Sequence, residues 1–551
     1  MKVTFTGNTP INCASGKTIL ELIKEYAPTL PEWTIAVHKN NRPYALTALI
    51  TEDCCLEPVT MRAIEGRRIY QKSLALVLIK AFYDTFPGKR IQLLHSMSKG
   101  VYCRALIDRA LTAEDCGLLH ARMAEIIASD LPFEEESFAR EEALGYFARH
   151  GLIDKVELLQ HTNLDTICLT KLANTREILY IPPLPSTSWL HAWDLILYSD
   201  GLLLRYPTTN DPSCLPAHKE QKKLFDILHE DSEWAKILEV TNVGELNRTI
   251  SNHSISEVIK LSEALQEKKI AHIADEIANH NPPVKFILIA GPSSAGKTTF
   301  SKRLAIQLRV NGIKTANIST DDYFLAREMT PRLPNGDYNF EDIGALNLEL
   351  FNAHLSELFE GRPVMVPKFN FTTGTAKPEK ATPLKLPKEM PVIIEGIHCL
   401  NDQLSSAIRR ENKYLIYISA LTQLNIDDSN RIPTTDNRLL RRIVRDSLYR
   451  NYSALETLRR WPVVRAGEEK NIFPFQEQAD IMFNSAQIYE LAVLKNFALP
   501  RLMQIPYTEA EYGEARRLVT FLTSFLGIDT TDEIPPTSIL REFIGNSSFR
   551  Y

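Results

Sequence analysis

The hydrophobic positions in the second half of the chain form short apolar runs joined by stretches of helical spacing. The three clearest runs are Phe286–Ala290, Ala316–Thr320 and Pro391–Gly396. Continuous apolar runs of this length are typical of strands that are buried on both faces of a sheet. After the first run, Phe300, Leu304 and Leu308 recur at the spacing of one helix face. Strands that alternate with helices predict an α/β region with a doubly wound parallel sheet over residues 283–500.

The first 62 residues have a different pattern, in which short strands surround one helix. Lys2–Thr6 alternates polar and apolar positions, and Thr34–Val37 and Ala45–Ile50 are expected to be further strands. Helical spacing begins at Ile19. These elements predict a small, ubiquitin-like α+β unit.

The middle and the end of the chain are predicted to be richer in helix. Ile69–Phe86 and Thr112–Ala128 have the periodicity of helices within a second α+β unit, and an amphipathic helix is expected over Glu509–Leu526. The segment between the second unit and the sheet lacks the glycine, serine or proline enrichment of a flexible linker. The expected division of the chain is 1–62, 63–215, 216–282 as a helical connector, 283–500, and 501–551 as a C-terminal helical appendage.

The composition places the chain among ordinary soluble proteins. Its 551 residues are 44% hydrophobic and 24% charged, and the formal net charge is −5. This charge argues against a protein that binds nucleic acid over its whole surface. The eight cysteines form no C-x-x-C pair and are expected to be reduced thiols. No apolar stretch approaches the roughly 20 residues of a membrane span, so we expect a cytoplasmic protein without a membrane contact.

The junction between the first apolar run and its helix carries the pattern G-x-x-x-x-G-K-[ST]. A glycine loop between a strand and a helix turns successive backbone N–H groups toward one anion, and the helix N-terminus adds partial positive charge. Lys297 is placed to reach the β- and γ-phosphates of ATP, and the Thr298 hydroxyl is placed to bind Mg²⁺. The residues expected to hold the ATP phosphates are Gly291, Pro292, Ser293, Ser294, Ala295, Gly296, Lys297, Thr298 and Thr299.

Two carboxylates follow the next apolar runs. Asp321 comes directly after the second run and Glu395 lies near the end of the third, so both are expected at the edge where α/β sheets bind ligands. An acid at the position of Glu395 organises Mg²⁺ in P-loop enzymes, here together with Thr298. Further along, four arginines share one face of a predicted helix, and their charge suits a triphosphate: Arg438, Arg441, Arg442 and Arg445.

In this order the four motifs resemble the uridine kinase/phosphoribulokinase branch of P-loop kinases, from about Val284 to Pro500. The resemblance implies ATP and Mg²⁺ as cofactors and phosphoryl transfer to the 5′-hydroxyl of a nucleoside. It makes Asp321 the general base, Glu341 the residue that holds the ribose hydroxyls, and Arg450 a further contact to the cofactor. The residues with implied catalytic roles are Lys297, Asp321, Arg442 and Arg445. The implied substrate contacts are Asp321, Tyr323, Phe324, Glu341, Phe369, Phe371 and Arg442.

The sequence departs from this family where the base of the nucleoside is recognised. The family has a Tyr and, five residues later, a His, and Phe369 and Gly374 stand at these positions. Phenylalanine stacks on a base without hydrogen-bonding its edge, and glycine has no side chain, so discrimination between bases is expected to be relaxed. A nucleoside is the leading acceptor, with a non-nucleoside hydroxyl, such as that of a sugar phosphate, as the alternative.

The first half of the chain resembles threonyl-tRNA synthetases. Residues 1–62 are similar to their TGS domain. Residues 63–215, with Glu65-Gly66 before the long helix and Trp189 in the closing strands, are similar to their editing domain. The positions that hold His and Cys in that editing site are Tyr70, Leu74, Leu179 and Pro183 here. These side chains cannot build a His/Cys site, so the ester-hydrolysing activity is expected to be lost.

A weak contact with tRNA or another RNA is a further expectation for the first half. Residues 62–109 contain ten Lys and Arg residues against three acids, and such a local excess can bind phosphates, although a solvated helix face is the simpler explanation. The alternative function is therefore an RNA-binding sensor whose P-loop unit is a nucleotide switch. Asp321 favours the kinase, because a switch needs no acceptor base. The sequence is also compatible with a homo-oligomer.

Overall fold

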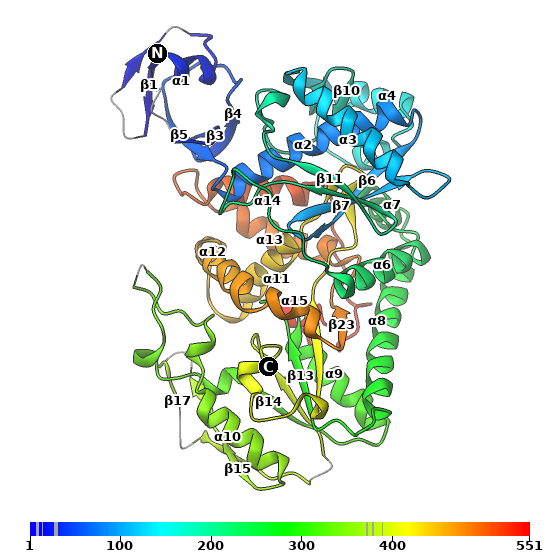
Figure 1. Ribbon diagram of the computed structural model, residues 1–551, viewed down its shortest axis with the longest axis vertical. Coiled ribbons are helices and arrows are strands. Elements are labelled where there is room, and N and C mark those ends of the chain that lie inside the picture. Colours follow the sequence, from blue (N-terminus) through cyan, green and yellow to red (C-terminus); the bar gives the residue numbers. More distant parts are fainter. Residues whose placement is uncertain are drawn as a thin grey trace.

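The computed structural model describes residues 1–6, 10–13, 15–26, 31–334, 336–370, 373–376, 380–387 and 390–551. The first two units lie at one end of the molecule, and the parallel sheet lies at the other (Figure 1). The long helix α8 (Ile255–Ala278) runs along one side of the sheet. Within the described part of the chain, no helix has both the length and the apolar sequence needed to cross a bilayer.

The predicted parallel sheet is present, and its central strand is the one that precedes the glycine loop. The predicted runs form β13 (Phe286–Ala290), β14 (Ala316–Ser319) and β19 (Val392–Glu395). Two further strands complete the sheet, β20 (Lys413–Ser419) and β23 (Ile481–Asn484). The strand order is β14-β19-β13-β20-β23, and all neighbouring pairs are parallel. The strand ends agree with the expected ones to within one residue.

Four helices cover the sheet: α8, α6 (Lys222–Ile237), α9 (Lys297–Val310) and α10 (Leu348–Phe359). Alternate residues of β13 bury against opposite pairs of these helices. Ile287 and Ile289 belong to the core under α8 and α9, whereas Phe286 and Leu288 belong to the core under α6 and α10. This is the doubly wound arrangement that the alternating pattern predicts. Helices α6 and α8 come from the predicted connector, so that segment also covers the sheet.

The remaining helices of the second half pack around a separate apolar core. They are α7 (Val243–Ser251), α11 (Thr434–Tyr449), α12 (Ala454–Asn471), α13 (Glu490–Met503), α14 (Tyr512–Thr523) and α15 (Arg541–Ile544). The helix expected near the C-terminus is α14. Two small hairpins pair β15 (Val364–Val366) with β18 (Thr382–Leu384) and β16 (Phe369–Asn370) with β17 (Thr375–Ala376).

In its described residues, the first unit is a five-stranded sheet with one helix. Its elements are β1 (Lys2–Phe5), β2 (Ile11–Asn12), α1 (Ile19–Tyr26), β3 (Thr34–Lys39), β4 (Arg42–Ala45) and β5 (Cys54–Thr60). In the order β2-β1-β5-β3-β4, strands β1 and β5 pair in parallel. The expected strand over Ala45–Ile50 is wrong. That segment turns after β4, and Leu46 and Ile50 reach the small core from the turn, while β5 completes the sheet.

The second unit contains two antiparallel sheets and four helices. Its strands are β6 (Arg90–Met97), β7 (Gly100–Leu106), β8 (Phe133–Ala139), β9 (Thr166–Leu172), β10 (Thr175–Glu177), β11 (Asp194–Tyr198) and β12 (Gly201–Arg205). One sheet has the order β11-β12-β7-β6 and the other the order β10-β9-β8. The helices are α2 (Ile64–Thr85), α3 (Ala113–Ala128), α4 (Arg140–Arg149) and α5 (Ile153–Gln160). Both predicted helices of this unit, α2 and α3, are present.

A hairpin from the second half of the chain is packed into the second unit. It consists of β21 (Asn425–Asp427) and β22 (Asn430–Arg431), and it leads into α11. The fully buried ammonium group of Lys155 lies 3.0 Å from the carboxylates of both Glu177 and Asp427. The hairpin makes further hydrogen bonds to Ile178 and Leu93. The two halves of the chain therefore share a buried, charged interface.

Candidate active site

The glycine loop between β13 and α9 is held in a tight curve. A Cβ on Gly291 would lie 2.0 Å from the carbonyl oxygen of Ile418, so a larger residue does not fit there. Gly296 has a φ of +82°, a region that glycine adopts without strain, and Ser294 has a φ of +60°. The Ser294 hydroxyl is buried and has no hydrogen-bond partner in the described structure. A loop of this curvature with an unpaired donor fits an anion.

Lys297 and Thr298 begin helix α9 beside this loop. The Lys297 ammonium group donates to the carbonyl oxygens of Gly291 at 3.0 Å and Pro292 at 3.2 Å, so its charge lies at the loop. The Thr298 hydroxyl lies 3.1 Å and 3.3 Å from the two carboxylate oxygens of Glu395. Protein sites for Mg²⁺ commonly use one or two protein groups together with phosphates and water. The pair Thr298 and Glu395 fits such an ion.

Three carboxyl groups from different segments gather near Lys297. Burial raises the pKa of Glu395 to about 7, with Lys297 opposing the shift. Burial also raises the pKa of Glu341 to about 7, against the nearby Arg442 and Lys297. Asp321 follows β14, and solvent still reaches its side chain; the protein atoms around it raise its pKa, again against Lys297. The structure thus brings together the three acids that the resemblance singles out.

The arginines of α11 divide into two groups. Arg438 and Arg441 are fully buried and form ion pairs with Glu468 and Glu490. Their guanidinium groups also donate to carbonyl oxygens of the glycine loop, at 3.0 Å and 3.3 Å. The expectation that all four predicted arginines face a triphosphate is therefore wrong for these two. They lie on the flank of α11 that packs against the loop, where they support it from within the core.

The other predicted arginines border the loop and keep some exposure. Arg442 donates to the Ser293 hydroxyl at 2.7 Å. Arg445 and Arg450 lie 3.1 Å and 3.6 Å from the carboxylate of Asp446. The side chain of Arg450 is 51% exposed. Arg442 therefore lies at the loop, and all three guanidinium groups share Asp446 and keep some exposure to solvent.

Glu468 and Glu490 contribute to the site without any signal in the sequence. Glu468 is completely buried, and one of its carboxylate oxygens accepts a hydrogen bond from the backbone N–H of Ser293 at 3.0 Å. Glu468 is followed by a second acid, Glu469, in α12, and Glu490 is the first residue of α13, where an acid is common in any helix. Their burial follows from packing between helices, which helical periodicity alone does not reveal.

The residues implied to contact the acceptor fall into two groups. The rings of Phe324 and Phe369 lie 5.6 Å apart and form an apolar wall. Tyr323 is only 2% exposed, and its hydroxyl is 3.0 Å from His354 Nδ1, so its phenol belongs to the core and does not reach the cleft. This placement corrects the expected substrate contact of Tyr323. Phe371 lies outside the described residues.

Gly374 marks the place where the resemblance has a histidine. Its φ is +73°, and a Cβ there would lie 2.6 Å from Nε of Arg327. The backbone N–H of Arg327 donates to the carbonyl oxygen of Gly374 at 2.9 Å. The space of the missing side chain is therefore covered by an arginine from a distant segment, a contact that the linear sequence does not indicate.

The C-terminal appendage also forms part of the site. Thr299 donates to the Glu542 carboxylate from its hydroxyl at 2.5 Å and from its backbone N–H at 3.3 Å. If Gly296 carried a Cβ, that atom would lie only 2.4 Å from Cγ2 of Ile539. Ile539 therefore packs directly against the loop. The loop residue Thr299 is thus already engaged by a carboxylate of the same chain.

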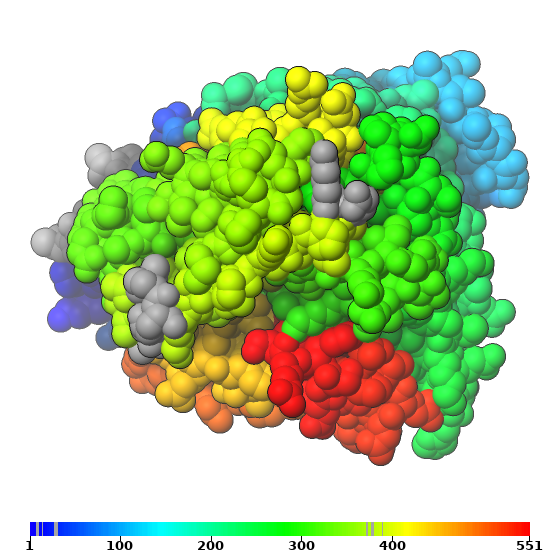
Figure 2. Space-filling model, turned by 90° about the horizontal axis from the view of Figure 1, so that it is seen from below, coloured from blue at the N-terminus to red at the C-terminus, as the bar shows by residue number. Residues whose placement is uncertain are grey.

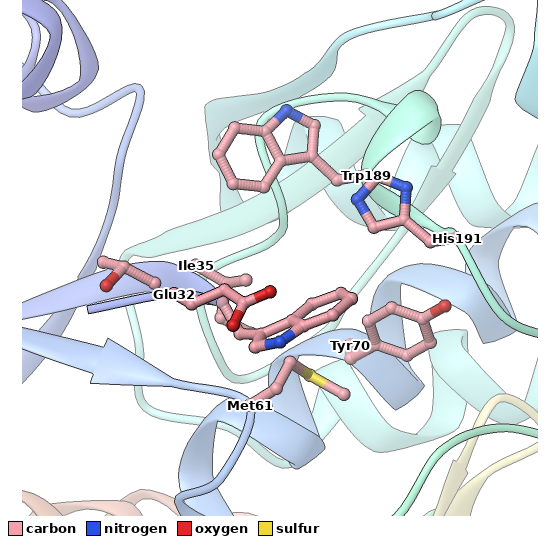
Figure 3. A pocket seen from close by; sticks show the side chains of 8 residues that line it. Glu32, Ile35, Met61, Tyr70, Trp189 and His191 are labelled. Atoms are coloured by element: carbon pink, nitrogen blue, oxygen red, sulfur yellow. The ribbon is translucent and has the colours of Figure 1, made fainter. Parts of the chain in front are cut away.

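In the second unit, the positions aligned with the editing site lie in apolar surroundings. Tyr70, Leu74 and Leu179 share one hydrophobic core, and Pro183 is also buried. A cavity of about 190 Å³ opens beside Tyr70, between the first and second units (Figure 3). It is lined by Glu32, Trp33, Thr34, Ile35, Met61, Tyr70, Trp189 and His191.

Most basic residues of the segment 62–109 are paired within the chain. Seven of the ten lie within 4 Å of a carboxylate, in the pairs Arg68–Glu514, Lys80–Asp84, Lys89–Asp108, Arg90–Asp428, Lys99–Glu469, Arg104–Asp200 and Arg109–Asp115. Three of these partners come from the second half of the chain. Most of the local excess of positive charge is therefore compensated within the chain, in three cases by carboxylates of the other half.

Residues 286–492 match the model of the Phosphoribulokinase / Uridine kinase family. A solved structure described as a possible uridine kinase from Bacillus stearothermophilus is similar over 39% of this chain and 98% of its own, with 17% identity and a TM-score of 0.27. The family match confirms the predicted resemblance of the second half.

The first half of the chain matches threonine–tRNA ligases. The ligase of Symbiobacterium thermophilum is 28% identical over 182 residues, which are 33% of this chain. The ligase of Desulforamulus reducens is 29% identical over 159 residues, or 29% of this chain. The matched parts are 28% and 25% of those two proteins, so the chain spans little more than a quarter of the curated relatives that it matches.

Proposed function

We propose that this chain, which carries a region of the phosphoribulokinase/uridine kinase family, is an ATP-dependent kinase that acts on a hydroxyl group of a small molecule. The observation that supports this most strongly is the grouping of Lys297, Asp321 and Glu395 beside the glycine loop. A loop that holds a triphosphate and a carboxylate that accepts a proton are the parts that phosphoryl transfer requires. The 5′-hydroxyl of a nucleoside is the acceptor that we propose first.

The side chains of the cleft have roles that fit their surroundings. When bound, ATP supplies the phosphoryl group and Mg²⁺ compensates the charge of its phosphates. Thr298 and Glu395 would hold the metal ion, and Lys297 would lie against the phosphates. Asp321 accepts the proton of the acceptor hydroxyl, and burial raises the pKa of this carboxyl, which makes its carboxylate a stronger base.

Glu341 and the arginines of α11 have different roles in this proposal. With a pKa near 7, Glu341 exists in both protonation states at neutral pH, so it can donate to one ribose hydroxyl or accept from another. Arg442 contacts the loop and Arg445 follows it by about one turn of α11, and both would neutralise the charge that develops on the phosphoryl group. Phosphoryl transfer depends mainly on such positioning and electrostatic stabilisation.

The residues on the acceptor side of the site suit a wider range of acceptors than pyrimidine nucleosides alone. The ring of Phe369 is only 5% exposed and packs against Phe324, so it offers no polar group that would read a base. Arg327 brings a guanidinium group to Gly374, which suits an acceptor that carries a phosphate or carboxylate. The acceptor is identified by ADP release from ATP and Mg²⁺ in the presence of uridine, cytidine, adenosine or sugar phosphates. ADP release that no acceptor raises above the ATPase background would contradict the kinase proposal.

Asp321→Asn is the direct test of the proposed base. The amide keeps the shape of the side chain but cannot accept a proton, so we expect kcat to fall by at least about a hundredfold while ATP still binds. The control is Asp226→Asn, an exposed acid of α6 that pairs with Lys222 and should leave kcat unchanged. A normal kcat for Asp321→Asn would remove this residue from the role.

A sensor that binds RNA is the second candidate, and the cavity beside Tyr70 favours it. The rings of Trp33, Trp189 and His191 line this cavity, and unpaired RNA bases bind by stacking on such rings. Purified protein would be mixed with tRNA, with binding measured by filter retention and turnover by ADP release. If tRNA neither binds nor changes turnover, this candidate is rejected.

The compartment that we propose is the cytoplasm. All eight cysteines are free thiols, four of them buried, which is the usual state in a reducing environment. Protein that is purified under oxidising conditions should therefore gain no disulfide that stabilises it. A higher melting temperature after oxidation would argue for another compartment.

A further inference from the structure

The end of the chain covers one side of the glycine loop. Viewed from below, the red C-terminal end borders a hollow that the yellow-green segment bounds on the other side (Figure 2). Ile539 and Phe543 are fully buried in the core under α9 and anchor the segment there. Glu542 lies between these anchors, so its side chain is brought to the start of α9.

Two polar groups of this segment bind the same loop residue. The Glu542 carboxylate accepts hydrogen bonds from the backbone N–H and the hydroxyl of Thr299. The hydroxyl of Tyr551, the last residue, lies 2.9 Å from the same Thr299 hydroxyl. The Lys302 ammonium group lies 4.7 Å from the centre of the Tyr551 ring and donates to the carbonyl oxygen of Arg550. The first turn of α9 is therefore closed by the C-terminal residues.

A carboxylate at this position competes with a phosphate. Thr299 is the third residue of α9, and the N–H groups of the first turn of a helix have no partner within the helix. In a glycine loop these groups and the positive end of the helix dipole bind phosphate oxygens. The same N–H group cannot serve Glu542 and a phosphate at once, and the two negative charges repel each other.

We propose, on the basis of the kinase function above, that Glu542 sets the affinity of this site for nucleotides by occupying a phosphate position. ATP binding displaces the Glu542 side chain and the terminal residues up to Tyr551, while Ile539 and Phe543 stay in the core. Lys302 lies one turn beyond Thr299 on the same face of α9, so it can pair with the displaced carboxylate. The C-terminal segment thus weakens ATP binding in a graded way and does not block it.

The test compares ATP and adenosine binding to the full chain by isothermal titration calorimetry. Glu542→Gln keeps the size of the side chain and removes its charge. We expect the variant to bind ATP about tenfold more tightly, a difference of about 1.4 kcal/mol, and adenosine, which has no phosphates, with unchanged affinity. The matched control is Glu533→Gln, an acid of the same segment that lies 3.5 Å from Lys260 and away from the loop.

Each outcome decides between the proposals. Equal or weaker ATP binding by Glu542→Gln, with Lys297→Ala still abolishing binding, would show that Glu542 only caps α9 and would overturn this inference alone. Failure of the wild type and the variant to bind ATP at all would overturn the proposed function as well. If the variant does not fold, deuterium exchange of the wild type decides. ATP should speed exchange at residues 546–551, and unchanged or slower exchange there would overturn the inference.

Discussion

Buried carboxyl groups in this protein differ in the partner that each one has. Glu490 lies beside the guanidinium group of Arg441 and the amide of Asn437. Asp231 is equally buried, but the group that donates to it is the uncharged amide of Asn484, at 2.6 Å. Without a cation in contact, burial raises the pKa of Asp231 to about 8. At neutral pH this carboxyl is therefore mostly protonated.

Asp231→Asn should remove part of the pH dependence of stability. The pKa of Asp231 is higher in the folded chain than its ordinary value of 3.8. Its contribution to stability is therefore complete below about pH 4 and is lost as the pH rises to about 8. We expect the urea midpoints of variant and wild type to be similar at pH 4 and the variant to be the more stable at pH 9. A difference that is the same at both pH values would contradict this assignment.

Residues that follow strands are predictable at this scale, whereas residues within helices are not. Asp321 and Glu395 stand at the ends of apolar runs, and parallel strands bring their carboxyl ends to one edge of a sheet. Glu468 and Glu542 touch the same loop, but an acid in an amphipathic helix has the pattern of a solvated one. The contact between Ser293 and Glu468 joins residues 175 positions apart. Only the packing of α12 against the loop creates it.

Among the elements, α11 shows what helical spacing predicts correctly and what it does not. The i, i+3, i+4 pattern of its arginines predicts a single face, and the helix itself lies where the pattern places it. A helix face is broad, however, and one flank of it enters the core beside the loop while the other borders the cleft. The strand, glycine loop and helix around residue 291 are local and were predictable. The buried ion pairs that hold the loop to α12 and α13 were not.

Glu490→Gln should destabilise the fold, because it removes one of the buried ion pairs that hold the loop. The variant keeps the shape of the side chain but leaves the guanidinium group of Arg441 buried without its counter-charge. Loss of one partner of a buried pair costs about 3–5 kcal/mol, which urea unfolding followed by circular dichroism would measure. The control is Glu233→Gln, whose exposed pair with Lys236 should leave the midpoint unchanged. An unchanged midpoint for Glu490→Gln would mean that the pair contributes nothing to the loop.

At the scale of the whole molecule, the hairpin β21–β22 joins the two halves. Burial disfavours the charge of Lys155, but Asp427 and Glu177 outweigh this and raise its pKa well above the ordinary value. Asp427 comes from the second half of the chain and Glu177 from the first. The sequence predicts a division into units, because each segment has its own pattern, and that division stays a prediction. The sequence does not predict the ionic core between them, since its members are scattered single residues.

Lys155→Met should destabilise both halves of the chain together. Two buried carboxylates lose their cation, which we expect to cost about 3–5 kcal/mol at pH 7. The loss should be smaller at pH 5, because a buried carboxyl without a cation is tolerated when it is protonated. Urea unfolding at the two pH values measures both effects, and Lys222→Met, with an exposed side chain, serves as the control. An equal loss at both pH values would speak against a charged core.

The hairpin also limits how this chain can be rearranged by recombination or by design. Since residues of one half complete the interior of the other, neither half can be replaced on its own. A foreign domain put in place of the second unit would leave Asp427 buried without a cation unless it supplied one there. A working chimera would have to carry a lysine at the position of Lys155 along with it.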